Sequence, residues 1–378
     1  MTDIQGTCRS DFDGVRQAFA ANFESGADVG ASVAITVDGE FVVDLWGGTA
    51  TFDSGEAPWQ EDTIINVWST TKTMAALTCL VLADRGVLDP YEPIATYWPE
   101  FAAGGKERVA TRHVLSHSAG LSGWDEPLVK EDLLDPKKLT ALHAAQAPWW
   151  EPGSQPGYHA ISQGYLLGEI VERITGKSLG TVFAEEIAGP LGADFHIGTG
   201  EEHDSRVAHV IPPSGNLGDA DADRDSIAWR TMGNPALTAD FSSTREWRRT
   251  EIPAAGGHGN ARSVALAHTP TACGGSARGV DLLSPEGVAR IFDKQVEGKD
   301  LVLGIDVVHG MGFGLPGPML PVPNERVCFW GGWGGSLAIV DLDARMSFSY
   351  VMNRMGEGTT GDLRGASLLL AAYTTLMS

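Results

Sequence analysis

The 378-residue chain is poor in positive charge and in cysteine, and it has no long hydrophobic run. Lys and Arg number 27 against 49 Asp and Glu, so the formal net charge is −22. Nucleic acids and anionic membranes are bound through basic surfaces, and we therefore expect neither as a partner. No apolar stretch is long enough to cross a bilayer as a helix. The first residues lack the basic and apolar regions of a signal peptide, so we expect a cytoplasmic protein.

Several chemical signatures are also missing. The four cysteines are scattered and form no C-x-x-C pair, which predicts free thiols rather than a disulfide framework. They are Cys8, Cys79, Cys273 and Cys328. The chain has no G-x-S-x-G elbow of the α/β-hydrolases, no P-loop and no Rossmann glycine pattern. His113 and His117 are four residues apart, but without a third ligand we expect them to bond to nearby backbone rather than to zinc.

The composition is that of a folded globular protein, with 43% hydrophobic and 20% charged residues. β-rich pairs of segments lie near both ends of the chain, at 31–37 with 41–46 and at 336–342 with 346–352. Helical spacing is found at 10–25, 162–175 and 362–376. We therefore predict an α+β fold, with one antiparallel sheet built from both chain ends and an inserted helical subdomain.

The predicted boundaries follow this pattern. Residues 1–65 and 240–378 would carry the sheet, and residues 66–239 would form the mainly helical part. We expect a loop between the first hairpin and residue 63, a β-like segment at 302–308 and a long acidic loop at 201–234 that walls a site.

The stretch from 66 to 85 is the most informative part of the chain. Ser69 and Lys72 lie three residues apart at the predicted start of a helix that is apolar on nearly every side and ends at Gly86. Residues at this spacing share a helix face, so the hydroxyl and the amine can meet. Burial would lower the lysine pKa, and a neutral amine can take a proton from serine. Taken alone, the same spacing also fits a helix cap followed by a surface lysine.

Two later segments can complete such a site. Tyr158 follows a Pro/Gly-rich loop at a helix entrance, where a neighbouring ammonium would lower the phenol pKa and let it pass protons. It could equally be an aromatic plug. The segment 329–336, Phe-Trp-Gly-Gly-Trp-Gly-Gly-Ser, brings backbone N–H groups close to a ligand, where they can face an oxyanion. Trp330 and Trp333 would add apolar walls, although a bulged turn packed by aromatics is the simpler alternative.

Together, Ser69-Thr-Thr-Lys72, Tyr158 and Trp330-Gly-Gly332 resemble the serine β-lactamase and penicillin-binding-protein superfamily. Within it the chain is most similar to the family VIII carboxylesterases, which share the class C β-lactamase fold. The supporting phrases are Tyr97-Trp-Pro-Glu-Phe101, Leu115-Ser-His-Ser-Ala-Gly-Leu121, Pro156-Gly-Tyr-His159 and Asn260-Ala-Arg-Ser263. They span most of the chain in the expected order.

The resemblance implies a role for each of these residues. Ser69 would be the nucleophile, Lys72 its base partner and Tyr158 the proton relay to the leaving group. The backbone N–H groups of Ser69 and Trp333 would form the oxyanion hole, in a site between the two parts of the chain. Residues expected to contact substrate are Trp330, Gly331, Gly332, Trp149 and Trp150. No metal or organic cofactor is implied.

Two departures from the β-lactamase pattern favour an ester as substrate. Ala160 stands where these enzymes usually place Asn, and Trp330-Gly331-Gly332 replaces their Lys-Thr-Gly. The missing lysine would normally attract a substrate carboxylate, so we predict a carboxylesterase that acts on neutral small-molecule esters. The alternatives are a β-lactamase or D-alanyl-D-alanine peptidase-like hydrolase, an acyltransferase on the same scaffold, and a non-catalytic sensor. The sequence does not determine the oligomeric state.

Overall fold

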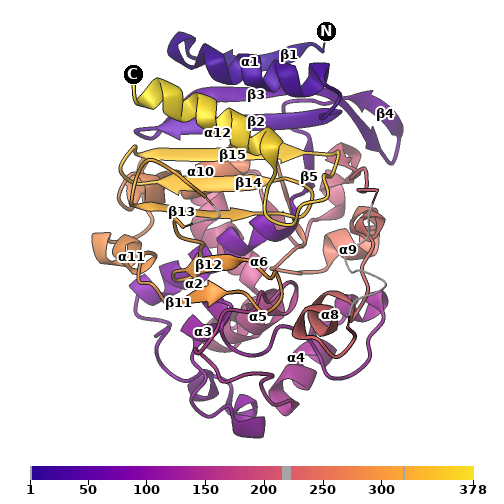
Figure 1. Ribbon diagram of the computed structural model, residues 1–378, viewed down its shortest axis with the longest axis vertical. Coiled ribbons are helices and arrows are strands. Elements are labelled where there is room, and N and C mark those ends of the chain that lie inside the picture. The colour runs from indigo at the N-terminus through magenta and orange to yellow at the C-terminus, as the bar shows by residue number, and fades with distance from the viewer. Residues whose placement is uncertain (1, 215–222, 318–319) are drawn as a thin grey trace.

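The central sheet is antiparallel and seven-stranded, and it is built from both ends of the chain (Figure 1). The computed structural model describes residues 2–214, 223–317 and 320–378. The strand order is β1-β3-β2-β15-β14-β13, and β4 pairs with the far part of β3. The strands are β1 Ile4–Cys8, β2 Gly30–Val37, β3 Glu40–Phe52, β4 Gly55–Pro58, β13 Val327–Gly331, β14 Leu337–Asp341 and β15 Met346–Met352.

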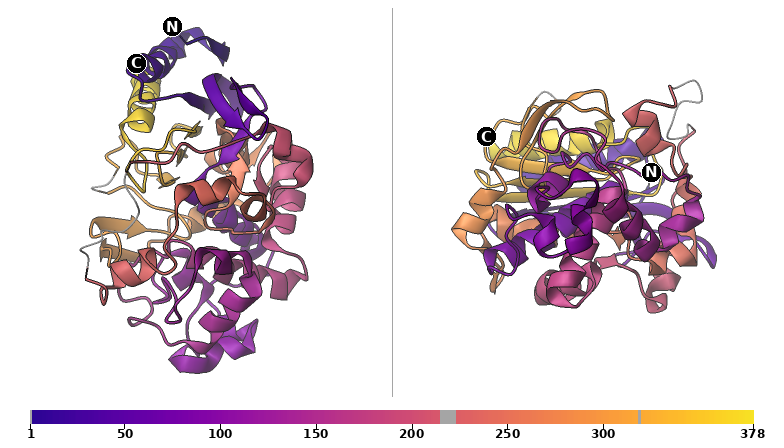
Figure 2. Two further views of the ribbon diagram at one scale, coloured as in Figure 1. Left: turned by 90° about the vertical axis from the view of Figure 1, so that its right-hand side faces the viewer. Right: turned by 90° about the horizontal axis from the view of Figure 1, so that it is seen from below.

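The two faces of the sheet carry different side chains, because neighbouring residues of a strand point to opposite sides. Large apolar residues such as Val33 and Ile35 pack against helices α1 Asp13–Glu24 and α12 Leu363–Leu376. Small residues face α10 Ala261–Ala272, where the Thr36 and Thr269 hydroxyls lie 2.9 Å apart. Both faces are therefore buried, and both termini lie at the end of the molecule away from the helical part (Figures 1 and 2).

The helical part surrounds α2 Thr71–Asp84, which passes through the centre of the molecule. Every residue from Thr71 to Ala83 is buried, in one core shared with α10 and the sheet. The other helices are α3 Thr111–Leu115, α4 Pro136–Ala145, α5 Ser162–Thr175, α6 Leu179–Phe183, α7 Gly189–Leu191, α8 Ile227–Met232, α9 Arg245–Arg249 and α11 Pro285–Arg290. Short 3-10 helices cover Ser10–Phe12, Trp68–Thr70, Ile94–Thr96, Pro99–Gly105, Lys130–Leu134, Glu201–Arg206 and Ala239–Ser243, and a π-helix covers Ala184–Ala188.

Three small sheets complete the structure. A four-stranded sheet of order β6-β8-β5-β7 lies beside the start of α2, and two hairpins pair β9 with β10 and β11 with β12. Their bounds are β5 Ile64–Asn66, β6 His196–Ile197, β7 Val207–Ala208, β8 Gly257–Gly259, β9 Ser276–Ala277, β10 Val280–Asp281, β11 Val296–Lys299 and β12 Asp306–His309. None of the helices in the described segments is long and apolar enough to cross a membrane.

The predicted α+β class, both terminal hairpins and the three helices at 10–25, 162–175 and 362–376 are confirmed. The loop expected between the first hairpin and residue 63 is wrong in part. β3 continues to Phe52 and turns back into β4. The sequence did not predict this continuation, because the glycines at 47 and 48 interrupt the alternation of apolar residues by which a strand is recognised. The edge strand β1 was also not predicted, because most of its side chains are exposed.

Two other expectations are corrected. The β-like segment at 302–308 is strand only from Asp306, because the Asp300 carboxylate accepts the N–H groups of Val302 and Leu303 and folds them into a turn. The region 201–234 was expected to be a loop, but it contains a 3-10 helix, β7 and α8, and residues 215–222 lie outside the described residues. The boundaries at 65 and 239 stay a prediction.

Buried histidines make the fold sensitive to acid. Burial lowers the pKa values of six of them from 6.5 to about 3 or about 4. They are His113, His143, His159, His258, His268 and His309. Between these values and pH 6.5 the unfolded chain binds more protons than the folded one, so the free energy of unfolding falls as the pH drops through this window. Each imidazole contributes about 1.4 kcal/mol per pH unit.

We expect the substitution His143→Leu to flatten this dependence by about 1.4 kcal/mol per pH unit, because one proton acceptor is removed from the unfolded state. His143 packs against Trp124, with ring centroids 4.7 Å apart, and does not line the cavity beside Ser69. Urea unfolding of the variant and the wild type at about pH 7, 6 and 5 measures the slope. Equal slopes would show that His143 titrates alike in the folded and unfolded chains.

Candidate active site

Ser69 lies in the 3-10 helix Trp68–Thr70, which leads directly into α2, and it follows a strained residue. β5 ends at Asn66, and the Val67 N–H donates to the carbonyl of Gly257 at 2.9 Å. Trp68 then adopts φ of 49°, a left-handed conformation that bulky residues rarely take. Its ring packs between Trp247 and Trp333, at 5.6 and 4.9 Å between centroids. This packing turns the chain so that the Ser69 side chain lines a cavity while remaining 7% exposed.

Lys72 is fully enclosed one helical turn further on, as the spacing predicted. Its Nζ lies 3.1 Å from Ser69 Oγ and donates to the carbonyl oxygens of Ala160 at 2.7 Å and Ala254 at 2.9 Å. Burial holds the pKa of Lys72 well below its usual value, in the direction that the sequence predicted. A neutral amine has two N–H donors and one lone pair. The two carbonyls match the donors, which leaves the lone pair for the serine hydroxyl.

Tyr158 reaches the same serine from the other side. Its Oη lies 2.5 Å from Ser69 Oγ, and its ring lies 4.8 Å from Lys72 Nζ. The sequence predicted that a nearby ammonium lowers the phenol pKa, and this is wrong. Burial dominates and raises the pKa of Tyr158 to about 12, so the phenol is protonated at neutral pH and can act as a proton donor.

The glycine-rich turn after β13 lies directly against the start of the Ser69 helix. Ser336 Oγ donates to the Val67 carbonyl at 2.8 Å and lies 2.9 Å from Thr70 Oγ1. A Cβ on Gly332 would collide with Ser336 Oγ and with the Val67 carbonyl, so only glycine permits this approach. The turn thus places Trp333 beside Ser69.

Two backbone N–H groups at this contact have no hydrogen-bond partner among the described residues. Within residues 2–214, 223–317 and 320–378, no hydrogen bond is formed by the N–H of Ser69 or of Trp333. The side chains of both residues line the cavity. Unpaired donors beside a nucleophile are what the predicted oxyanion hole requires.

The cavity beside Ser69 is small and uncharged. It contains about 350 Å³ of space not filled by protein atoms, including the part that is open to solvent. The described residues that line it are Trp68, Ser69, Tyr158, Ala160, Ile161, Met232, Leu237, Ala255, Trp333 and Thr359. None of these side chains carries a formal charge, so the cavity suits a neutral and largely apolar group.

Trp330 contacts Tyr158 rather than the cavity itself. Its ring stacks on His117 at 4.9 Å and lies 5.9 Å from the Tyr158 ring. Gly331 packs against the backbone at Thr360, where a Cβ would collide. Trp330 therefore packs against Tyr158, and Gly331 packs against Thr360, but neither lines the cavity beside Ser69.

The predicted contribution of Trp149 and Trp150 to the pocket does not agree with their positions. Trp149 donates to Asp125 at 2.8 Å and stacks under the Arg230 guanidinium. Trp150 packs on Gly157, where a Cβ would lie 2.5 Å from its ring. Neither side chain is among the described residues that line the cavity. The sequence contains no pattern around these two residues that predicts whether they lie in the cavity or beside it.

His113 and His117 bond to nearby backbone, as predicted. The Ala110 N–H donates to His113 Nδ1 at 3.1 Å, and the His159 N–H donates to His117 Nδ1 at 3.0 Å. All four cysteines are free thiols, as expected. In the part of the chain that the structure describes, no group of three or more His, Cys, Asp or Glu side chains is arranged to hold a metal ion.

Asp300 is the main contributor that the sequence did not reveal. It is 1% exposed, and its Oδ1 accepts the N–H groups of Tyr158 at 3.1 Å, Val302 at 2.8 Å and Leu303 at 2.8 Å. Burial raises the pKa of this carboxyl above its usual value. Asp300 therefore anchors the backbone that presents Tyr158. No local pattern marks the contact, because 142 residues separate the two partners.

Known proteins share this architecture over almost the whole chain. The family model described as Beta-lactamase matches residues 15–373. The esterase/beta-lactamase LipL of Mycobacterium tuberculosis is 33% identical over 369 residues, which cover 93% of this chain and 83% of LipL. The crystal structure of a family VIII carboxylesterase is 42% identical with a TM-score of 0.92, covering 99% of this chain and 100% of that one. A penicillin-binding protein homologue from Caulobacter crescentus is 37% identical with a TM-score of 0.91, at the same coverage.

Fold and site together define a protein of the serine β-lactamase and penicillin-binding-protein class. More particularly, the chain belongs to the beta-lactamase family, and its similarity to a family VIII carboxylesterase confirms the resemblance that the sequence motifs indicated.

We expect Asp300→Ala to lower the free energy of unfolding by roughly 2–4 kcal/mol, because three buried N–H groups lose their acceptor. Asp300→Asn keeps an oxygen in place and should remain within about 1 kcal/mol of the wild type. Chemical denaturation measures both. Asp306→Ala, an exposed acid in the same hairpin, is the matched control and should change little. Equal losses in the Ala and Asn variants would mean that the charge, not the hydrogen bonding, provides the anchor.

Proposed function

We propose that this chain is a serine hydrolase that cleaves short-chain carboxylic esters through an acyl-serine intermediate. One observation carries the proposal. Ser69 Oγ lies within hydrogen-bond reach of both Lys72 Nζ, at 3.1 Å, and Tyr158 Oη, at 2.5 Å, on the wall of an uncharged cavity. A nucleophile with a base on one side and a proton donor on the other is the minimum set for acyl transfer.

Lys72 acts as the base that activates Ser69. Burial depresses its pKa and so favours the neutral amine, whose lone pair can accept the proton of the serine hydroxyl 3.1 Å away. As Ser69 Oγ bonds to the ester carbonyl carbon, its proton passes to Nζ. The carbonyl oxygen becomes an oxyanion, which the unpaired N–H groups of Ser69 and Trp333 stabilise.

Tyr158 delivers a proton to the departing alcohol. The phenol is protonated at neutral pH, so it can donate to the alkoxide as the carbon–oxygen bond breaks, and Lys72 then returns a proton to Tyr158. In the second half of the cycle, water attacks the acyl-serine, the same groups take its proton, and Ser69 leaves as a hydroxyl. The chain returns to its starting state without a redox step or an external acid.

The character of the cavity supports a neutral ester with a small acyl group. A substrate carboxylate would find no cationic partner among the described lining residues, and an unpaired buried charge is strongly unfavourable. Ala160 contributes a methyl group to this wall and its carbonyl to Lys72. One related protein is a carboxylesterase by name, and LipL is named an esterase/beta-lactamase. We therefore propose an ester, rather than a β-lactam or a peptide, as the small-molecule partner.

We expect Ser69→Ala to lower kcat for p-nitrophenyl acetate and butyrate by roughly 10³-fold or more, because the acyl-enzyme cannot form. The wild type should show a burst of p-nitrophenol when deacylation is slower than acylation. Ser54→Ala, in the exposed β3–β4 turn, is the matched control and should leave turnover unchanged. Wild-type-like hydrolysis in the Ser69 variant would remove this serine from the mechanism.

The same assay separates the alternatives. Nitrocefin should be cleaved far more slowly than the esters, and a faster rate with nitrocefin would make the chain a β-lactamase. Added alcohols or amines should not divert most of the acyl group, and preferential formation of the transfer product would make it an acyltransferase.

Ester hydrolysis should rise with pH through the depressed pKa of Lys72, because only the neutral amine accepts the serine proton. No fall due to Tyr158 is expected below its pKa of about 12. Lys72→Arg retains the positive charge at every accessible pH and should abolish the rise together with the activity. The measurement is kcat/KM across the range in which the fold is stable. A flat profile in the wild type would contradict a lysine base.

A further inference from the structure

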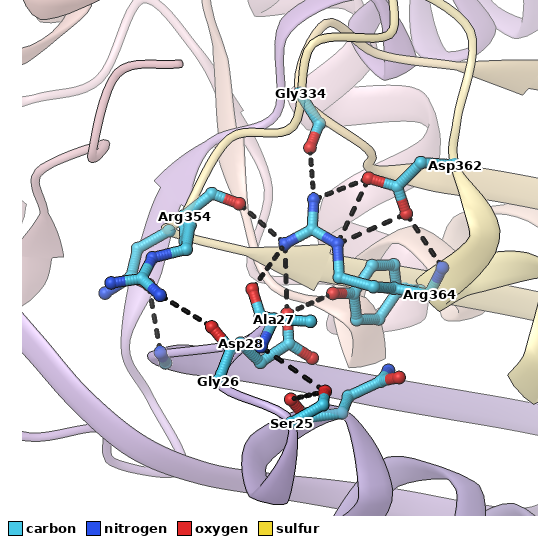
Figure 3. A network of polar contacts seen from close by, with 12 residues as sticks. Ser25, Gly26, Ala27, Asp28, Gly334, Arg354, Asp362 and Arg364 are labelled. Carbon is cyan, nitrogen blue, oxygen red and sulfur yellow. Dashed lines mark hydrogen bonds and ion pairs between the residues drawn. The ribbon is translucent and has the colours of Figure 1, made fainter. Parts of the chain in front are cut away.

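Arg364 is a buried arginine that contacts the glycine-rich turn at Gly334, next to Trp333 (Figure 3). Arg364 is in the first turn of α12 and is 8% exposed. Its Nη2 donates to the carbonyl of Gly334 at 2.6 Å. Gly334 directly follows Trp333, so the guanidinium contacts the turn next to the residue whose N–H is unpaired.

The guanidinium joins its own segment to residues from both ends of the chain (Figure 3). Nη1 donates to the Ala27 carbonyl at 3.2 Å, to Asp28 Oδ1 at 3.1 Å and to the Arg354 carbonyl at 2.7 Å. Nη2 and Nε bond to the Asp362 carboxylate, at 2.6 Å for the Nη2 contact. These bonds allow the planar guanidinium only one orientation. The Gly334 carbonyl, which bonds to the same guanidinium, is therefore also held in one position.

Asp28 helps to hold the Arg364 guanidinium in this orientation. Its side chain is fully buried, and its Oδ1 also accepts the Tyr350 hydroxyl at 2.5 Å. Tyr350 belongs to strand β15 of the main sheet. The Tyr350 hydroxyl bonds to Asp28 and not to the turn, which makes it a useful point of comparison.

The turn itself is tightly defined. The Gly335 N–H donates to the Gly332 carbonyl at 3.1 Å, and the Gly334 carbonyl accepts a second bond from the Gly356 N–H at 2.8 Å. Gly335 has φ of 125°, and a Cβ there would lie 2.5 Å from Asp362 and 2.7 Å from Arg364. The turn therefore packs directly against the ion pair between Arg364 and Asp362. The Gly332 carbonyl shares a peptide plane with the Trp333 N–H, and the Gly335 N–H shares one with the Gly334 carbonyl. The bond between Gly335 and Gly332 therefore links the plane that Arg364 holds to the plane that carries the Trp333 N–H.

We infer that Arg364 is a positioning residue for the oxyanion hole. It holds the Gly334 carbonyl and thereby keeps the Trp333 N–H aimed at the place where the substrate oxyanion develops. This inference rests on the proposed ester hydrolysis. Ser336 fixes the same turn on the Ser69 side, so the N–H is held between two contacts, one made by a hydroxyl and one by a guanidinium.

The test compares two substrates that differ in one atom. A thionoester carries sulfur in place of the carbonyl oxygen, and sulfur is larger and accepts hydrogen bonds weakly, so it gains little from an oxyanion hole. In the wild type, the ratio of kcat/KM for the oxygen ester to that for the thionoester should be high. In Arg364→Lys this ratio should fall about 10- to 100-fold, through kcat, with KM within about threefold. Lysine keeps the charge but cannot hold Gly334, Asp28 and Asp362 at once.

Two variants in the same network serve as controls. Tyr350→Phe removes the second donor to Asp28, and Arg354→Gln removes an exposed side chain that bonds to the Gly26 carbonyl. Both should leave the ratio unchanged even where the melting temperature falls. If Arg364→Lys does not fold, Asp362→Asn weakens the same ion pair while keeping the oxygen that caps α12, and its ratio should fall in the same direction.

The outcomes are distinct. Equal losses for both esters, in proportion to lost stability, would make Arg364 a purely structural residue and overturn the inference. Unchanged ratios in the Arg364 and Asp362 variants, with normal Ser69-dependent turnover in the wild type, would overturn the inference alone. A wild type without Ser69-dependent turnover would overturn the proposed function and this inference with it.

Discussion

The burial of one amine is the constraint on which the rest of the site depends. Lys72 lies on a helix that is apolar on every side, and desolvation alone accounts for its depressed pKa. In the described part of the chain no carboxylate pairs with it, so nothing restores the charged form. An ion pair at this position would hold the amine protonated and remove the base. The apolar character of α2 is therefore a requirement of the chemistry as well as of the core.

The groups around Lys72 come from distant parts of the chain, and each segment is fixed by a buried polar contact. Asp300 holds the backbone of Tyr158, Ser336 holds the glycine-rich turn against the Ser69 helix, and Arg364 holds the turn from behind. These contacts lie outside the cavity and leave its lining uncharged. Rigid support from enclosed hydrogen bonds allows a small apolar pocket to keep a precise arrangement of donors.

The whole molecule is strongly negative, whereas the described lining of the cavity beside Ser69 carries no charge. The chain has a formal net charge of −22, yet the described lining of the cavity has no charged side chain. The surface repels anionic ligands over a long range, and the pocket offers them no partner. Both effects act in the same direction and favour neutral substrates. Where a β-lactamase of this class would present a lysine, Trp330 instead stacks on His117 and supports Tyr158.

The sequence determined the features that depend on near neighbours. The helix of Ser69 and Lys72, the two hairpins and the terminal helices follow from spacing and turn residues within a few positions. The motifs further placed Tyr158 and Trp333 in one site, and the structure brings both to Ser69. Only the tertiary structure decided the direction of the Tyr158 pKa, the distance of Trp149 and Trp150 from the cavity, and the contacts of Asp300 and Arg364. Burial and long-range hydrogen bonds depend on segments that meet only when the chain has packed, and no local pattern records them.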